Sequence, residues 1–203
     1  MLPLFLLAAA DPETPVDAER AFYAAAQRDG QWTAFRRFMA DGATVFTPQP
    51  VEAAKVLPKK DPAIAVQWWP GESYVSCDGS VAVNTGPWVR PDSVGYFTTV
   101  WERQGDGRYK WIVDAGDALP AARALPEEPR VRRAACNFPR GMAVGVIFEP
   151  DGARRGEGVS KDGTLAWAWR VMPDGSRSFT AKIWTGRRFE TVVRDDVAAP
   201  PAG

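Results

Sequence analysis

The feature that most constrains this fold is a change in the spacing of apolar residues near position 73. Apolar side chains recur at helical spacing from Val16 to Ala26, and after Gly30 a second helical pattern runs from Trp32 to about Met39. Beyond residue 73, apolar and polar side chains alternate, which is the period of a half-buried strand. We therefore expect N-terminal helices followed by an antiparallel sheet.

Two turns in the strand region indicate hairpins. Asp78-Gly79 separates the apolar runs 73–77 and 80–85, and a tight turn of this kind needs positive φ, which glycine adopts freely. A second turn at 104–108 separates the runs 95–103 and 109–115. Between the helices and these hairpins we expect a short buried strand at 43–47, a loop at 48–62 and a helical turn at 63–68.

The C-terminal part of the chain is predicted to be rich in β-structure. Residues 118–129 contain three prolines and form the expected connector, and 130–195 form the β-rich extension, followed by a tail at 196–203. Turn residues separate four predicted strands, at 142–149, 164–172, 178–185 and 189–193. The pattern indicates a β-meander. Three arrangements stay open: the extension continues the first sheet, covers its mouth or packs as a separate layer.

The order of elements over residues 16–117 resembles that of the NTF2-like superfamily, and within it the SnoaL-like and DUF4440-type proteins. The resemblance is carried by the opening helix Ala18–Ala26, the shorter helix from Trp32, the buried strand around Val45-Phe46 and the strand end Trp111-Ile112-Val113-Asp114. It implies an α+β fold of the cone-like NTF2/cystatin type, in which a curved antiparallel sheet wraps the N-terminal helices around an apolar pocket. The C-terminal β-rich segment departs from this minimal fold.

Composition excludes several classes of function. Basic and acidic residues are equal in number, 25 each, so no net charge recruits nucleic acid. The chain has no histidine, which excludes Ser-His-Asp and Cys-His catalysis and the commonest zinc ligand sets. No nucleotide-binding loop is present. We expect no cofactor and no metal, and no segment has the roughly 20 apolar residues of a membrane span.

The first ten residues are apolar and end in three alanines, which is typical of the end of a secretory signal. With the linker that follows, residues 1–15 are interpreted as a signal-like segment, which predicts a periplasmic or secreted protein; a cytoplasmic one is the alternative. In an oxidising compartment Cys77 and Cys136 would pair as a disulfide. The other interpretation is two separate buried thiols, and the sequence leaves both open.

Asp114 is the candidate catalytic residue. It ends an apolar strand where the resemblance places a pocket, and a desolvated carboxyl there would have a raised pKa and could transfer protons. The structural alternative is a pairing with an arginine or exposure to solvent. Aromatic side chains of the same region are predicted to line a ligand pocket, with packing in the core as their alternative role. These ligand-binding candidates are Phe46, Trp69, Tyr74, Trp88, Tyr96, Trp101 and Trp111.

Three hypotheses of function follow from these residues. The first is a non-catalytic module of an exported protein that binds a small apolar or aromatic ligand. The second is a cofactor-independent isomerase or dehydratase that uses Asp114 with a tyrosine. The third is a structural protein that forms a homodimer through the open face of the sheet and has no pocket. A cavity with a buried carboxyl within reach would favour the second hypothesis, and a filled core the third.

Overall fold

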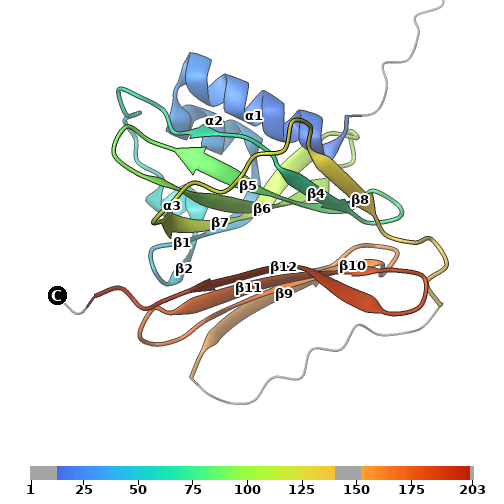
Figure 1. The fold of residues 1–203 in the computed structure, drawn as a ribbon. Helices are drawn as coiled ribbons and strands as arrows, with labels where there is room; N and C mark the ends of the chain where they lie inside the picture. Colours follow the sequence, from blue (N-terminus) through green and yellow to red (C-terminus); the bar gives the residue numbers. More distant parts are fainter. Residues whose placement is uncertain (1–12, 140–151, 202–203) are drawn as a thin grey trace, which may run out of the picture.

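The computed structural model describes residues 13–139 and 152–201 (Figure 1). The signal-like segment at 1–10 and the strand predicted at 142–149 lie outside the described residues, so export and that strand stay predictions. No helix of the described part is long and apolar enough to cross a membrane.

Helix α1 (Pro15–Asp29) and helix α2 (Gln31–Phe38) occupy the positions that the apolar spacing predicted. The side chain of Thr14 accepts a hydrogen bond from the Asp17 backbone N–H at 3.1 Å, and Asp17 in turn accepts from Thr14, so a capping box starts α1. Gly30, with φ of 106°, separates the two helices. A third, short helix, α3 (Ala53–Val56), lies within the predicted loop.

The first sheet contains eight strands in the described part of the chain. Seven follow the order β2-β1-β7-β6-β5-β4-β8, and β3 pairs with β5 beside this path. Both predicted hairpins are confirmed, β4 with β5 and β6 with β7, and Gly79 has a φ of 70° in the first turn. The strands are β1 (Met39–Phe46), β2 (Pro50–Glu52), β3 (Gln67–Trp68), β4 (Glu72–Val75), β5 (Val81–Val89), β6 (Val94–Arg103), β7 (Tyr109–Leu119) and β8 (Arg130–Arg133).

The second sheet has the order β12-β11-β10-β9 and is antiparallel throughout. The predicted meander is confirmed for its last three strands. Trp167 and Trp169 on β10 pack against the apolar cluster that lies between the two sheets. The strands are β9 (Arg154–Val159), β10 (Leu165–Val171), β11 (Arg177–Trp184) and β12 (Phe189–Val197).

The elements form three layers, with α1 and α2 on one face of the first sheet and the second sheet on the other (Figure 1). The core between the helices and the first sheet is rich in aromatic side chains. Phe22, Trp101 and Trp111 are fully buried in it. Between the sheets lies an aliphatic core that includes Val83 and Val100 from the first sheet and Leu165 from the second. Each face of the first sheet is therefore covered by its own apolar layer.

The expected fold class, an α+β cone of the NTF2/cystatin type, is wrong. The structure is mostly β, with two sheets and three short helices in the described residues. The reason lies in residues 130–197, which the sequence pattern treated as an extension. Strand β8 joins the first sheet, parallel to β4, and β9–β12 bury that sheet's outer face. The open face on which a homodimer was predicted is thus covered within the chain.

Two smaller expectations are also settled. The helical turn predicted at 63–68 is wrong, because Gln67–Trp68 pairs as β3 with β5, with Trp68 opposite Trp88. Cys77 and Cys136 form a disulfide with their Cα atoms 5.1 Å apart. The bond joins the β4–β5 turn to the segment that follows β8. Of the two interpretations that the sequence left open, the structure therefore supports the disulfide and not two separate thiols.

Candidate functional site

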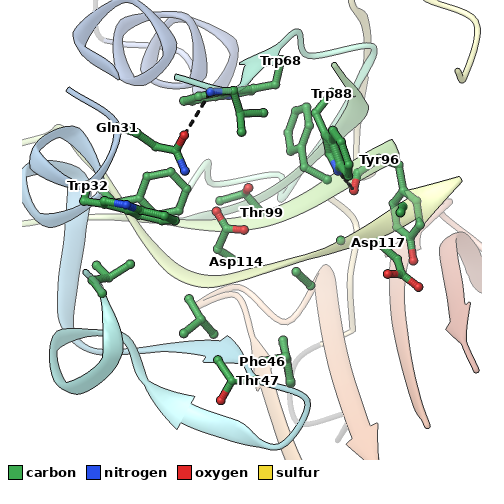
Figure 2. Close-up of a pocket in the computed structure, with 18 of the residues that line it drawn as sticks. Gln31, Trp32, Phe46, Thr47, Trp68, Trp88, Tyr96, Thr99, Asp114 and Asp117 are labelled. Atoms are coloured by element: carbon green, nitrogen blue, oxygen red, sulfur yellow. Dashed lines mark hydrogen bonds between the residues drawn. The ribbon is translucent and has the colours of Figure 1, made fainter. Parts of the chain in front are cut away.

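A cavity of about 640 Å³ lies between helices α1 and α2 and the first sheet (Figure 2). Strands β5, β6 and β7 form its floor, α1 and α2 one wall, and β1 with residues 56–58 another. The lining includes eight aromatic residues: Phe22, Trp32, Phe35, Phe46, Trp68, Trp88, Tyr96 and Phe97. The polar and charged lining residues are Glu19, Gln31, Thr47, Arg90, Ser93, Thr99, Asp114, Asp117 and Arg177.

The helical wall is held by aromatic rings that contact one another edge to face. The ring of Phe22 on α1 lies 4.8 Å from Phe35 on α2 and 4.9 Å from Trp68, between centroids. Trp32 lies 5.3 Å from Phe35. Pairs of this geometry add about 0.5–1.5 kcal/mol each beyond the burial of their area. The wall is therefore built from rigid side chains that fix each other's positions.

A row of polar residues crosses strands β5, β6 and β7, and two of its members line the cavity. Asn84, Thr99 and Asp114 lie directly opposite one another on β5, β6 and β7. The Nδ2 of Asn84 donates to the carboxyl of Glu19 on α1 at 3.2 Å. The sheet thus places two carboxyls, one from a helix and one from a strand, at the two ends of one polar row.

Glu19 is 1% exposed and accepts three side-chain hydrogen bonds. Besides Asn84, the indole N–H groups of Trp68 and Trp101 donate to it at 2.9 and 2.8 Å. Burial raises the pKa of Glu19 to about 7, and the three hydrogen bonds oppose that rise. Glu19 therefore has its acceptor positions filled by the protein itself.

Asp114 differs from Glu19 in having no hydrogen bond to any described residue. Its carboxyl points into the space among Trp32, Trp68 and Trp88, beside Thr99 (Figure 2). The side chain contacts this space but is otherwise enclosed by protein. Desolvation, followed by the charge of Glu19, raises the pKa of Asp114 to about 8. Asp114 is thus a carboxyl that is free to interact with whatever enters the cavity.

Gln31 supplies a hydrogen-bond donor to the same space. Its Oε1 accepts from the backbone N–H of Val66 at 3.0 Å, which fixes the orientation of the amide. Its NH₂ group then faces the cavity and donates to no described residue (Figure 2). Because the side chain of Gln31 is buried, only a molecule inside the cavity can accept a hydrogen bond from this NH₂ group.

Charged residues gather at the rim. The guanidinium of Arg177, from β11, donates to the carbonyl of Gly116 at 2.8 Å and lies 3.9 Å from the carboxylate of Asp117. Arg90 lies over the ring of Trp88 at 5.1 Å. Burial, and then the charge of Asp195, raises the pKa of Tyr96 above its usual range. The hydroxyl of Tyr96 points toward Asp117 and away from Asp114 (Figure 2), so the expected pair of Asp114 with a tyrosine is not formed by Tyr96.

Four of the eight residues predicted from sequence line the cavity: Phe46, Trp88, Tyr96 and Asp114. The other four lie elsewhere. Trp101 and Trp111 are buried in the aromatic core, where the Trp111 indole donates to the carbonyl of Phe35 at 3.2 Å. Tyr74 packs between the sheets and donates to Glu72 at 3.0 Å, and the ring of Trp69 lies 6.1 Å from that of Tyr23 on α1.

Glu19 is the main residue that sequence reasoning missed. The helix dipole favours any acidic residue near the start of a helix, so Glu19 does not stand out there; in the structure Asp17 caps α1 and Glu19 faces the core. A signal was available. Glu19 lies three residues after Val16 and three before Phe22, so it occupies the apolar face of α1. The other missed polar residues, Gln31 and Thr99, carry no comparable signal.

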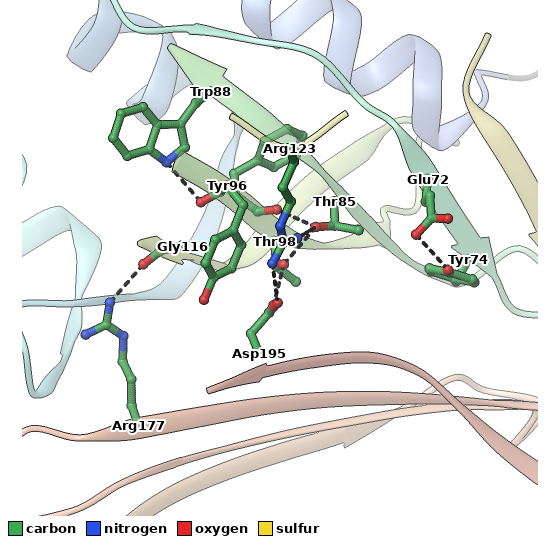
Figure 3. Close-up of polar contacts among 11 residues, drawn as sticks. Glu72, Tyr74, Thr85, Trp88, Tyr96, Thr98, Gly116, Arg123, Arg177 and Asp195 are labelled. Atoms are coloured by element: carbon green, nitrogen blue, oxygen red, sulfur yellow. Dashed lines mark hydrogen bonds and ion pairs between the residues drawn. The ribbon is translucent and has the colours of Figure 1, made fainter. Parts of the chain in front are cut away.

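A second polar cluster lies between the sheets, outside the cavity (Figure 3). The hydroxyl of Thr98 donates to Asp195 on β12 at 2.7 Å, and Arg123 donates to the same carboxylate at 3.1 Å. Arg123 also lies over the ring of Tyr96, 3.8 Å from its centroid. Each group in this cluster has a partner in the protein, which indicates a structural contact between the layers.

The described residues contain no group of three or more histidine, cysteine, aspartate or glutamate side chains that could hold a metal ion. What the site offers is two carboxyls, an amide donor and an aromatic wall around empty volume. A scan against protein-family models finds no match to the chain, and a search of curated proteins finds none either.

Proposed function

We propose that this protein binds a small organic molecule in the cavity between its helices and the first sheet. The observation that carries the proposal is the unpaired carboxyl of Asp114 inside a cavity of about 640 Å³. Ligand pockets in proteins usually have volumes of roughly 300–1,000 Å³, mostly apolar walls and a few oriented polar groups. This cavity has all three properties.

The physical argument concerns two polar groups that face the cavity without a protein partner. The carboxyl of Asp114 and the NH₂ of Gln31 form no hydrogen bond with a described residue, whereas Glu19 nearby accepts three. A ligand with a donor for Asp114 and an acceptor for Gln31 would pair with both groups, and the aromatic residues of the wall would contribute apolar contact.

Binding is tested by titration calorimetry with a panel of small apolar and aromatic molecules. Val56 lines the cavity wall and is 40% exposed, so Val56→Trp adds bulk there at little cost in stability. Val131, 58% exposed on β8 and outside the cavity, gives the matched control Val131→Trp. We expect at least tenfold weaker binding for Val56→Trp and unchanged binding for Val131→Trp. Equal affinities of the two variants, or a panel without any binder, would contradict the proposal.

A second candidate function is proton transfer to or from a bound substrate, as in a cofactor-independent isomerase or dehydratase. The observation that favours it is the raised pKa of Asp114, about 8, at a position in contact with the cavity. A general base works best when its pKa is close to the working pH. Because Tyr96 points away, the donor that could stabilise a developing negative charge is the amide of Gln31 instead of a tyrosine.

Proton transfer is tested by incubating carbonyl compounds that have acidic C–H bonds with the protein in D₂O. Asp114 would remove a proton from carbon and return deuterium, which NMR detects as loss of the C–H signal. Asp114→Asn should abolish the exchange and leave binding of neutral compounds intact. Exchange that persists in Asp114→Asn removes this residue from the mechanism.

A further inference from the structure

The charges that line the cavity are unevenly distributed between its floor and its rim. Two acids face the interior, Glu19 on the α1 wall and Asp114 on the floor, and no ion pair joins either of them to a described basic residue. The two basic residues of the lining, Arg90 and Arg177, lie at the rim, and Arg177 already contacts Gly116 and Asp117. The interior therefore holds acceptor carboxyls and no balancing cation of its own.

We propose that the ligand of this cavity is a protonated organic amine, whose ammonium group donates to Asp114 while its apolar part contacts the aromatic wall. This inference rests on the proposed binding function and specifies its ligand class. The ammonium would occupy the space into which the Asp114 carboxyl points, among Trp32, Trp68 and Trp88 (Figure 2).

Three features of the site support an amine over a neutral molecule. First, Asp114 has no donor in the protein, and an ammonium group supplies up to three. Second, indole rings attract cations through their faces, worth roughly 0.5 kcal/mol at exposed sites and about 2 kcal/mol or more when desolvated. Third, a cation next to Asp114 relieves the repulsion between Asp114 and Glu19, because it offsets the charge that both carboxylates carry when ionised.

Glu19 is not the primary contact in this arrangement. Its carboxyl is occupied by Asn84, Trp68 and Trp101, and these contacts hold it against the floor. Its role is to add negative potential from the α1 side. The free NH₂ of Gln31 on α2 suits an amine that also carries a hydroxyl or carbonyl oxygen.

The titratable and charged groups that face Asp114 are few. Glu19 comes from α1, while Asp117 on β7, Arg90 after β5 and Arg177 on β11 lie at the rim; α2, α3 and β1 contribute none to the lining. Because desolvation and the charge of Glu19 raise the pKa of Asp114 to about 8, its carboxyl carries a proton at pH 7 that a bound ammonium group would displace. Amine binding should release a proton to the buffer, and the apparent affinity should rise as the pH rises toward 8.

The test uses three probes of matched shape: 4-phenylbutylamine, 4-phenylbutanol and 4-phenylbutyrate. Titration calorimetry of the full chain should give at least tenfold tighter binding for the amine than for the alcohol, and the weakest binding for the carboxylate. Repeating the amine titration in phosphate and in Tris, which differ in ionisation enthalpy, should show proton release. Asp114→Asn should reduce amine affinity at least tenfold and leave alcohol affinity within twofold, and Asp106→Asn, an exposed change in the β6–β7 turn outside the cavity lining, should leave the amine preference unchanged.

Each outcome has one meaning. If the alcohol or the carboxylate binds as tightly as the amine, or if Asp114→Asn keeps the preference for the amine, the ligand class is wrong while the binding function stands. If none of the three probes binds but another member of the wider panel does, the amine inference again fails alone. If nothing in the panel binds, the proposed function fails and this inference with it.

Discussion

The indole nitrogen of Trp101, on β6, donates a 2.8 Å hydrogen bond to the carboxyl of Glu19, on α1, although the two residues are separated by 82 positions in the chain. Trp68 donates to the other carboxyl oxygen at 2.9 Å. These contacts connect the first helix to the middle of the first sheet through a buried acid. Burying a charged group at that position costs desolvation free energy. The hydrogen bonds to its partners therefore contribute more to stability than the charge itself does.

Replacing Glu19 by alanine should lower the free energy of unfolding by about 3–5 kcal/mol, because two indole N–H groups and the amide of Asn84 lose their acceptor. Glu19→Gln keeps one acceptor oxygen and should cost about 1–3 kcal/mol. Chemical denaturation measures both changes. Arg20→Ala, an exposed change on the same helix, is the control and should stay within about 1 kcal/mol of wild type. Equal stability of Glu19→Ala and Arg20→Ala would show that the buried contacts contribute nothing.

Stability should also depend on pH through Asp114. In the unfolded chain this carboxyl ionises near its ordinary pKa of 3.8, whereas the folded protein keeps it protonated up to about pH 8. The contribution of the protonated Asp114 carboxyl to the free energy of unfolding is therefore complete below about pH 3.8 and is lost as the pH rises through 8. One unit of pKa difference corresponds to 1.36 kcal/mol, so the loss is on the order of a few kcal/mol.

Denaturation curves between pH 4 and 8.5 test this dependence. We expect Asp114→Asn to have a flatter profile than the wild type, with the remaining slope at pH 4.5–7 due to Glu19, whose pKa is raised to about 7. Asp92→Asn, an exposed change in the β5–β6 turn, should keep the wild-type profile. Parallel profiles for the wild type and Asp114→Asn would mean that this carboxyl titrates in the folded protein as it does in water.

The contact between the sheets predicts a difference between a buried and an exposed ion pair. Asp195 is 6% exposed and accepts from Thr98 and Arg123, so Asp195→Ala should cost about 2–4 kcal/mol. Arg132 and Glu190 form a pair at 3.1 Å between half-exposed side chains, so Glu190→Ala should cost less than about 1 kcal/mol. Thermal denaturation of both variants, followed by circular dichroism, makes the comparison. A similar loss of stability in both variants would show that the buried and the exposed ion pair contribute equally.

The disulfide predicts a measurable loss on reduction. Cys77 and Cys136 close a loop with a sequence separation of 59 residues, and the chain-entropy relation gives about 4 kcal/mol for a loop of that length. The double variant Cys77→Ser with Cys136→Ser should be less stable by about that amount in denaturant titrations. Intact-mass measurement should show a gain of about two hydrogens after reduction of the wild type under denaturing conditions. An unchanged mass would contradict the disulfide.

Local signals in the sequence predicted local structure. The Asp78-Gly79 turn and the turn at 104–108 predicted the β4–β5 and β6–β7 hairpins, because a tight turn depends on residues that are neighbours in the chain. The packing of β9–β12 over the first sheet could not be obtained in this way. It depends on contacts between Val83, Val100 and Leu165, which no local pattern pairs.

The candidate site was predictable to a similar, limited extent. Alternation places Trp101 and Thr99 on the same face of β6, but it does not show that the helices bury Trp101 and leave Thr99 at the cavity. Asp114 was found because it follows an apolar run. The free NH₂ of Gln31 was not, because its orientation is set by Val66, which is 35 residues away in the sequence.

Arg177 belongs to the second sheet, yet its guanidinium holds the carbonyl of Gly116 in the first sheet at the mouth of the cavity. The entrance is thus shared by the two sheets, which the Thr98–Asp195 hydrogen bond, the Arg132–Glu190 ion pair and apolar packing also join. Sliding of one sheet over the other by even a single side-chain width would break this bond and change the opening. The second sheet therefore forms part of the cavity's entrance and also covers the outer face of the first sheet.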